Sequence, residues 1–154
     1  MAIPRFLPEE YFAQRLDAYG VFVDRFGTIR RQFNVEVKGT RTSDGFILDE
    51  DFLYDDGERA ERTWVIRNTG VEADGSVRYE GIAADVSGSA SGRVAGNALN
   101  WEYDVVLEMS GRNVEVHFDD WIYRQDEDVA INRAFISKFG IEIGSVTIVF
   151  LRGR

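Results

Sequence analysis

Cysteine is absent from the sequence, and histidine occurs only once, at His117. Without cysteine there can be no disulfide, zinc–thiolate site, iron–sulfur cluster or cysteine nucleophile. A single imidazole also excludes every site that needs several histidines, and it leaves carboxylates as the main candidate metal ligands. We therefore expect the protein to need neither a metal ion nor a cofactor.

Positive charge is also scarce. The chain has 18 lysines and arginines against 27 aspartates and glutamates, which gives a formal net charge of -9 at pH 7. This excess of acid opposes binding to nucleic acids and to anionic lipid headgroups. The N-terminus has no apolar run of signal-peptide length. We expect no nucleic-acid partner, no membrane insertion, and a cytoplasmic location for the chain as written, or an envelope location if a leader was removed.

Hydrophobic residues make up 44% of the 154 residues, and 13% are aromatic. This composition predicts a folded chain with a substantial core, and the length favours a single domain over residues 1–154. Only the segment "LPEEYFAQRL" has helical features: a proline and two acids at its start, and the apolar residues Phe12 and Leu16 one turn apart. It predicts a short N-terminal helix and lead-in over residues 1–18.

Alternation of apolar and polar residues dominates the rest of the chain. In "FNVEVK", for example, every second residue is apolar, which is the period of a strand with one buried face. Turn signals such as "SDG", "DDG", "NTG" and "ADG" separate about nine or ten such runs. Their spacing predicts an all-β fold, an antiparallel up-and-down β-barrel, with a β-sandwich as the alternative. Gly39, Gly81 and Gly144 are expected at bulges or bends that help the sheet to close.

Two segments resemble known sites but lack essential residues. "GSASGRVAGN" has no Gly-Lys-Ser/Thr, and Ala90 stands where a serine-hydrolase nucleophile would be, so we expect a loop or an irregular strand at a barrel mouth. "LDEDFLYDDGE" is rich in carboxylates, but Leu53 stands where a calcium loop needs a ligand. We expect that segment to be a solvated strand end that runs into a hairpin.

The stretch "VHFDDWIYR" places two adjacent aspartates inside a predicted strand. By alternation, Asp119 shares the outer face with His117, whereas Asp120 lies on the apolar inner face. A carboxylate inside a barrel must be paired, hydrogen-bonded or protonated, because the loss of its water shell is costly. The same alternation predicts that Arg133 and Arg62 point inward, and either is the expected partner of Asp120.

Several aromatic residues are expected to line the interior of the barrel: Trp64, Tyr79, Trp101, Tyr103 and Phe118. A barrel of about eight or more strands is either filled by such side chains or holds a small apolar ligand.

Three long stretches, "LDEDFLYDDGERAERTWVI", "AGNALNWEYDVVL" and "DDWIYRQDEDVAINRAFISKFGIEIGSVTIVF", resemble segments of the bacterial family called domain of unknown function 3833. The resemblance covers residues 19–151 and implies a lipocalin-like β-barrel. Many family members are similar to envelope lipoproteins, although this chain has no lipobox cysteine. Members also tend to be encoded near enzymes of fatty-acid modification, which implies a lipid or another hydrophobic small molecule as the ligand.

Together these features favour a lipocalin-like binding protein for a hydrophobic small molecule such as a fatty acid or a derivative, as a monomer or a homodimer. The residues expected to contact the ligand are Arg62, Trp64, Tyr79, Trp101, Tyr103, Phe118, Asp120 and Arg133. One alternative is a small barrel enzyme of isomerase or cyclase type, with Asp120 as general acid or base beside Tyr103 or Arg133. Another is a structural or partner-binding module with a packed interior.

Overall fold

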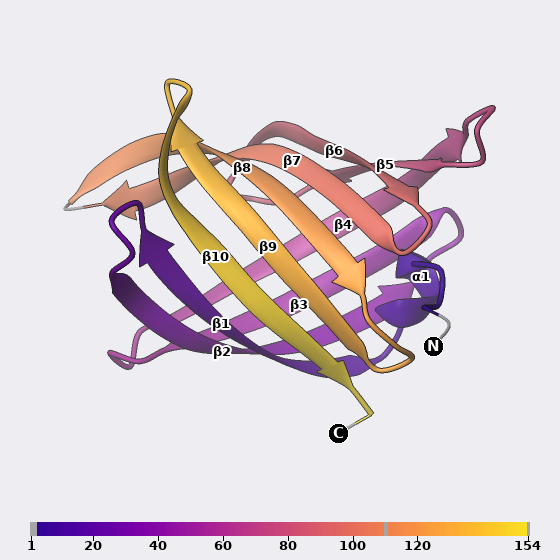
Figure 1. Ribbon diagram of the computed structural model, residues 1–154, viewed down its shortest axis with the longest axis horizontal. Helices are drawn as coiled ribbons and strands as arrows, with labels where there is room; N and C mark the ends of the chain where they lie inside the picture. The colour runs from indigo at the N-terminus through magenta and orange to yellow at the C-terminus, as the bar shows by residue number, and fades with distance from the viewer. Residues whose placement is uncertain (1–2, 110, 154) are drawn as a thin grey trace.

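Ten antiparallel strands follow one another in chain order around a closed barrel, in which the first strand pairs with the last. Figure 1 shows this computed structural model, which describes residues 3–109 and 111–153. The elements are α1 (Pro8–Tyr11), β1 (Arg15–Asp24), β2 (Ile29–Arg41), β3 (Gly45–Tyr54), β4 (Arg59–Val71), β5 (Val77–Ile82), β6 (Val86–Ala95), β7 (Ala98–Met109), β8 (Arg112–Arg124), β9 (Val129–Lys138) and β10 (Ile141–Arg152). The predicted up-and-down barrel is confirmed, and the sandwich alternative is wrong.

The alternating pattern produces strands with one buried face. In β2, Phe33, Val35 and Val37 point inward and are buried, whereas the polar residues between them are exposed. The signals "SDG", "DDG" and "ADG" lie in hairpin connections, where Gly57, for example, has a φ of 88° that other residues rarely adopt. "NTG" is different: it lies inside β4, where the register with β5 shifts beside Gly70. The prediction of a turn there is wrong, because the glycine serves a bulge.

The three glycines expected at bulges have two different roles. Gly144 lies where the register between β9 and β10 shifts, as predicted. Gly39 and Gly81 lie in regular pairings and instead allow close packing. A Cβ atom at Gly39 would lie 1.5 Å from the carbonyl oxygen of Phe12, and one at Gly81 would lie 2.7 Å from the ring of Trp101. Gly39 therefore lets the N-terminal segment cross β2, and Gly81 makes room for an aromatic side chain inside the barrel.

The N-terminal helix is shorter than the sequence predicts. Pro8 begins α1 and Phe12 caps its C-terminus, so the helix has four residues. Leu16 is buried in β1 rather than on a helix, and β1 already begins at Arg15. No helix within the described residues has the length and apolar character that a bilayer crossing requires.

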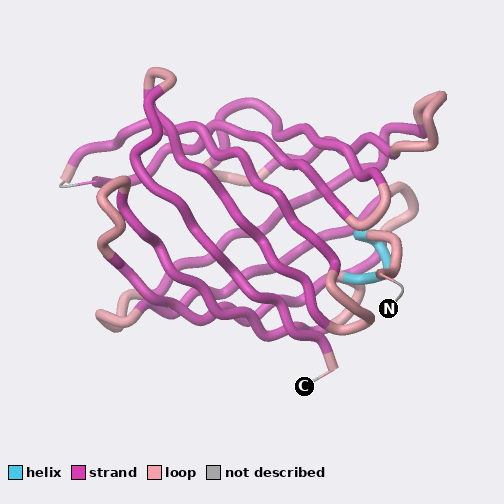
Figure 2. Tube along the Cα trace, in the orientation of Figure 1, coloured by secondary structure: helices cyan, strands magenta, loops and turns pink. Residues whose placement is uncertain are grey.

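Three aromatic side chains of the N-terminal segment close one end of the barrel. Phe6, Tyr11 and Phe12 are at most 2% exposed. The Phe12 ring stacks on Phe46 of β3 at 5.9 Å and meets Phe150 of β10 edge-on at 5.6 Å. We call these three N-terminal residues the plug. The plug lies beside the β6–β7 and β8–β9 connections, as Figure 2 also shows. The opposite end, where the β1–β2, β3–β4 and β9–β10 connections lie, is called the mouth.

Arg124, at the end of β8, ties the plug to the barrel. Its side chain is 4% exposed. The guanidinium donates hydrogen bonds to the backbone carbonyls of Arg5, Asp126 and Glu127 at 3.1 to 3.2 Å, and to the carboxylate of Glu10 at 3.1 Å. These bonds satisfy most of its donors, so the charge is buried without being left unpaired.

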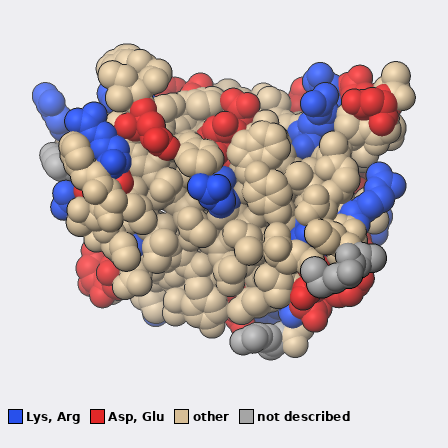
Figure 3. Space-filling view, viewed as in Figure 1, with Lys and Arg blue, Asp and Glu red and all other residues tan. Residues whose placement is uncertain are grey.

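The outer surface of β8 to β10 carries few charges near its centre. Figure 3 shows this face, with most acidic and basic side chains gathered toward its ends and upper edge. Outward residues such as Trp121 and Tyr123, whose rings stack at 6.2 Å, are partly buried by one another. Whether the protein is a monomer or a homodimer stays a prediction.

Candidate ligand-binding cavity

A cavity of about 620 Å³ lies inside the barrel. Its lining runs from Phe12 of the plug to Tyr54 and Glu58 at the mouth. The volume is within the range of small-molecule sites in proteins, which is about 300 to 1,000 Å³. The alternative in which side chains fill the interior is therefore wrong.

Seven of the eight residues that the sequence predicts as ligand contacts line this cavity. They are Arg62, Trp64, Tyr79, Trp101, Tyr103, Phe118 and Asp120. Arg133 is not among the lining residues. The structure thus brings the predicted aromatic and polar groups around one space, and their contact with a ligand stays a prediction.

The aromatic residues form one continuous wall. Trp64 of β4 meets Trp101 and Tyr103 of β7 edge-on, with ring centroids 5.6 and 5.0 Å apart. Tyr103 in turn stacks on Phe118 of β8 at 5.2 Å. Such contacts between rings fix their orientation, so this wall presents a rigid apolar surface to the cavity.

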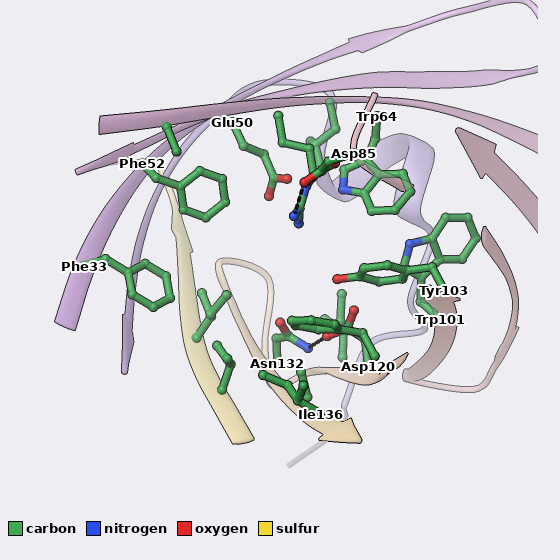
Figure 4. Close-up of a pocket in the computed structure, with 18 of the residues that line it drawn as sticks. Phe33, Glu50, Phe52, Trp64, Asp85, Trp101, Tyr103, Asp120, Asn132 and Ile136 are labelled. Carbon is green, nitrogen blue, oxygen red and sulfur yellow. Dashed lines mark hydrogen bonds and ion pairs between the residues drawn. The ribbon is translucent and has the colours of Figure 1, made fainter. Parts of the chain in front are cut away.

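Asp120 points inward from β8, as predicted, and is 7% exposed. Its Oδ1 atom accepts a hydrogen bond of 3.2 Å from the Asn132 side chain of β9 (Figure 4). Burial raises the pKa of Asp120 to about 6, although the hydrogen bond from Asn132 and the charge of Arg62 oppose the rise. Asp120 therefore changes its charge near neutral pH. The neighbouring Asp119 faces outward and accepts a hydrogen bond from Asn100 at 2.7 Å.

The prediction that Arg133 points inward is wrong. Asp120 is opposite Ala134 in the β8–β9 register, so Asn132, Ala134 and Ile136 form the inner face of β9. Arg133 is exposed on the outer face, with its guanidinium 5.3 Å from the ring of Phe135. The stretch "AINRAFIS" has apolar residues at both parities, and the bulkier set lies outside. Alternation alone could not decide between the two faces.

Arg62 does point inward, but Asp120 is not its hydrogen-bonded partner. Its Nη2 atom is 2.7 Å from Oδ2 of Asp85, and its Nε atom is 3.2 Å from both oxygens of that carboxylate. Asp85 lies in the connection between β5 and β6 and lines the cavity. The predicted pair of Asp120 with either arginine is therefore absent, and an arginine–aspartate pair with a different acid is present.

Glu50 of β3 is an inward carboxylate that the sequence reasoning missed. It lines the cavity together with Leu48 and Phe52. Figure 4 shows the side chains of Glu50 and Phe52. Burial raises the pKa of Glu50 to about 7; the charge of Arg62 opposes this rise, and that of Asp120 adds to it. The signal was available, because Glu50 has the same parity as Leu48 and Phe52. We overlooked this signal because Glu50 stands between Asp49 and Asp51, which lie on the other face and are exposed as expected.

His117 lies on the outer face of β8, as predicted. Its Nδ1 atom is 2.9 Å from the carboxylate of Asp104, and its Nε2 atom is 3.0 Å from that of Glu102. Partial burial lowers the pKa of His117, but the two hydrogen bonds outweigh it and the pKa is raised. No group of three or more potential metal ligands was found within the part of the chain that the structure describes.

The chain belongs to the family described as "Protein of unknown function (DUF3833)", which matches residues 2–152. No curated protein matches it in sequence. Among solved structures, it is similar to the S-type phycobiliprotein lyase CPES from Guillardia theta, with a TM-score of 0.69 and 7% identity over 95% of this chain and 90% of that one. At this identity the likeness shows a shared fold, and the expected lipocalin-like barrel is confirmed.

Proposed function

We propose that the protein binds a hydrophobic small molecule inside the barrel, such as a fatty acid or a derivative. The observation that carries the proposal is the cavity of about 620 Å³ with its continuous aromatic wall. Arg62, Tyr103 and Asp120, which come from separate strands, add inward polar groups that can orient a mostly apolar ligand. The plug closes one end, so the mouth is the expected entrance.

Binding can be measured with N-phenyl-1-naphthylamine, an uncharged dye whose fluorescence rises in apolar surroundings. We expect saturable binding that the variant Ala134→Trp weakens at least tenfold, because Ala134 lies on the cavity wall opposite Asp120 in the register. The matched control is Arg133→Trp, which adds the same indole at the next position of β9 but on the outer face. It should leave dye binding within about twofold of the wild-type value.

Two results would contradict the proposal. Dye fluorescence that does not saturate would mean that the cavity takes up no apolar molecule. Equal weakening by the two tryptophan variants would mean that the dye binds elsewhere. Native mass spectrometry of freshly purified protein complements the titration, because it detects a ligand retained from the cell.

One observation favours a second candidate function, catalysis by Asp120. This carboxyl has a pKa raised to about 6 and shares the cavity with the Tyr103 hydroxyl, whose pKa burial and the Asp120 charge raise. A buried acid with a pKa near neutrality suits a general acid or base. The test is chemical turnover of a retained ligand: Asp120→Asn should stop turnover but keep the ligand bound if Asp120 is catalytic.

A further inference from the structure

We propose that the cavity selects amphiphilic molecules whose polar group is uncharged or cationic, and that it discriminates against free carboxylates at neutral pH. This inference rests on the proposed function and narrows it: among fatty acids and their derivatives, it favours neutral or cationic derivatives over the free acids. It is carried by the placement of the charged groups around the cavity.

Acids outnumber bases in the cavity lining. Six carboxylates line it, against two arginines, Arg31 and Arg62. The carboxylates are Glu50, Glu58, Glu61, Asp85, Glu108 and Asp120. No lysine or histidine is among the described lining residues. An anionic ligand could therefore bind favourably only if one of the two arginines were free to receive it.

Both arginines already have carboxylate partners. Arg62 binds Asp85 through two of its nitrogens, at 2.7 and 3.2 Å. Arg31 contacts Asp56 and Glu58 at 3.2 and 2.9 Å. The guanidinium of Arg31 also lies over the ring of Tyr54, 3.6 Å from its centroid. A carboxylate ligand would therefore meet guanidinium groups whose charge is already offset by these acids, so it would gain little from pairing with them.

Glu50 and Asp120 set the electrostatics of the cavity centre. Figure 4 shows both side chains directed into the same space, Glu50 from β3 and Asp120 from β8. The nearby groups without net charge are the Arg62–Asp85 ion pair, the Tyr103 hydroxyl and the Asn132 amide, whereas the lining residues of β1 and β10 are apolar. Burial disfavours the charged form of both acids, and each carboxylate also raises the pKa of Tyr103. The region already resists negative charge, so it should also resist that of a ligand.

A hydroxyl, amide or ammonium group fits this region better than a carboxylate. Ionised Glu50 and Asp120 are acceptors only, and they can take hydrogen bonds from such donors. An ammonium group would also hold both acids in their charged forms, because an opposite charge lowers the pKa of a carboxyl. A carboxylate offers acceptors only and adds like charge where little water can screen it.

The test compares three ligands with the same alkyl chain: dodecanol, dodecylamine and laurate. Each is used at pH 8 to displace N-phenyl-1-naphthylamine from the wild-type protein. We expect dodecanol and dodecylamine to bind at least about tenfold more tightly than laurate. In the double variant Glu50→Gln, Asp120→Asn, we expect laurate to bind about tenfold more tightly than it does to the wild type, and dodecylamine more weakly.

The matched control is the double variant Asp51→Asn, Asp119→Asn. Asp51 and Asp119 are adjacent to Glu50 and Asp120 in the same strands and face outward, so this variant loses the same formal charge from the outer surface. It should keep the wild-type preference, because exposed charges are screened by salt.

The outcomes separate this inference from the proposed function. If laurate binds the wild type as tightly as dodecanol does, the inference is wrong, although binding in the barrel stands. If the inner and outer double variants bind laurate equally well, Glu50 and Asp120 do not cause the selection, and the inference is also wrong. If the dye itself fails to bind in the barrel, as judged with Ala134→Trp, the proposed function fails, and this inference fails with it.

Discussion

The plug end and the cavity centre both contain buried charged groups, but the two regions treat them differently. At the plug, Arg124 donates to three carbonyls and two carboxylates, and its guanidinium lies 5.3 Å from the centroid of the Tyr11 ring. In the cavity, Asp120 accepts a side-chain hydrogen bond from Asn132, and its pKa is nevertheless raised by burial to about 6. Glu50 faces the same open space with a pKa raised to about 7.

This difference separates groups that hold the fold from groups that are available to a ligand. Removing a buried charge that has all its partners destabilises the fold, because those partners are left unpaired. A buried acid with a raised pKa is different, because its charged form is already unfavourable in the folded protein. Evolution usually keeps such a group because function needs it. Replacing the charged side chain with a neutral one of similar shape should therefore lower the free energy of unfolding at the plug and raise it in the cavity.

The largest effect is expected at the plug. Arg124→Met keeps much of the side-chain volume but removes every donor, so the carbonyls of Arg5, Asp126 and Glu127 lose a partner and the plug loses its tie to β8. We expect a loss of about 3 kcal/mol in the free energy of unfolding, measured by urea denaturation. Arg133→Met removes the same group from the outer face of β9 and should change stability by less than about 0.5 kcal/mol. Similar losses in the two variants would mean that the Arg124 bonds do not hold the plug.

The cavity acids should show the opposite sign. Asp120 and Glu50 have folded-state pKa values of about 6 and 7, above their usual values, so the folded state binds more protons than the unfolded state between about pH 4 and 7. Their contribution therefore favours folding at low pH and is lost as the pH rises through this window. Above this window the ionised Asp120 carboxylate lowers the free energy of unfolding, and Asp120→Asn removes that cost. At pH 8 it should stabilise the protein by about 1 to 2 kcal/mol, and at pH 5 by much less.

The quantity to compare is the difference in the free energy of unfolding between variant and wild type at each pH. His117 also has a raised pKa, and its stabilising contribution likewise falls as the pH rises, so the absolute slope mixes several groups. Asp119→Asn, which removes a carboxylate from the outer face at the adjacent position of β8, is the control for the loss of one charge. Destabilisation by Asp120→Asn at pH 8 would indicate that Asp120 is paired with a positive charge, as the sequence first suggested.

Much of the fold could be predicted because it depends on local patterns. Alternation as in β2 and hairpin turns such as the one at Gly57 specify strands and their connections, and many short connections favour an up-and-down barrel. The same reasoning placed Asp120 inside and Asp119 outside, because their neighbours in β8 are strongly apolar at one parity only.

The charge pairing inside the barrel could not be predicted in the same way. It depends on which strands face one another across the cavity, and this is set by the closure of the sheet rather than by any one strand. Asp85 lies in a connection where alternation has no meaning, so its bond to Arg62 had no local signal. Arg133 was misplaced because β9 is apolar at both parities. Glu50 was missed because we interpreted its acidic segment as a whole rather than residue by residue.

The smallest expected effect concerns the mouth, which we expect to be less optimised for stability than the plug. Phe139, between β9 and β10, has a φ of 53° and is 90% exposed. A bulky side chain in this left-handed region is strained, and asparagine tolerates it better. Phe139→Asn should raise the free energy of unfolding by about 0.5 to 1 kcal/mol.

Phe26, between β1 and β2, provides the matched control. It is also an exposed phenylalanine at the mouth, and a cation lies near each ring: Arg25 at 4.8 Å for Phe26, and Lys138 at 4.5 Å for Phe139. Phe26 does not have a positive φ, so Phe26→Asn removes the same kinds of contact but relieves no strain. Its effect should be near zero or slightly destabilising. If both variants gain stability equally, backbone strain is not the cause. If only Phe139→Asn gains stability, the mouth keeps a strained residue beside the proposed entrance to the cavity, whereas substitution of Arg124 at the plug costs stability.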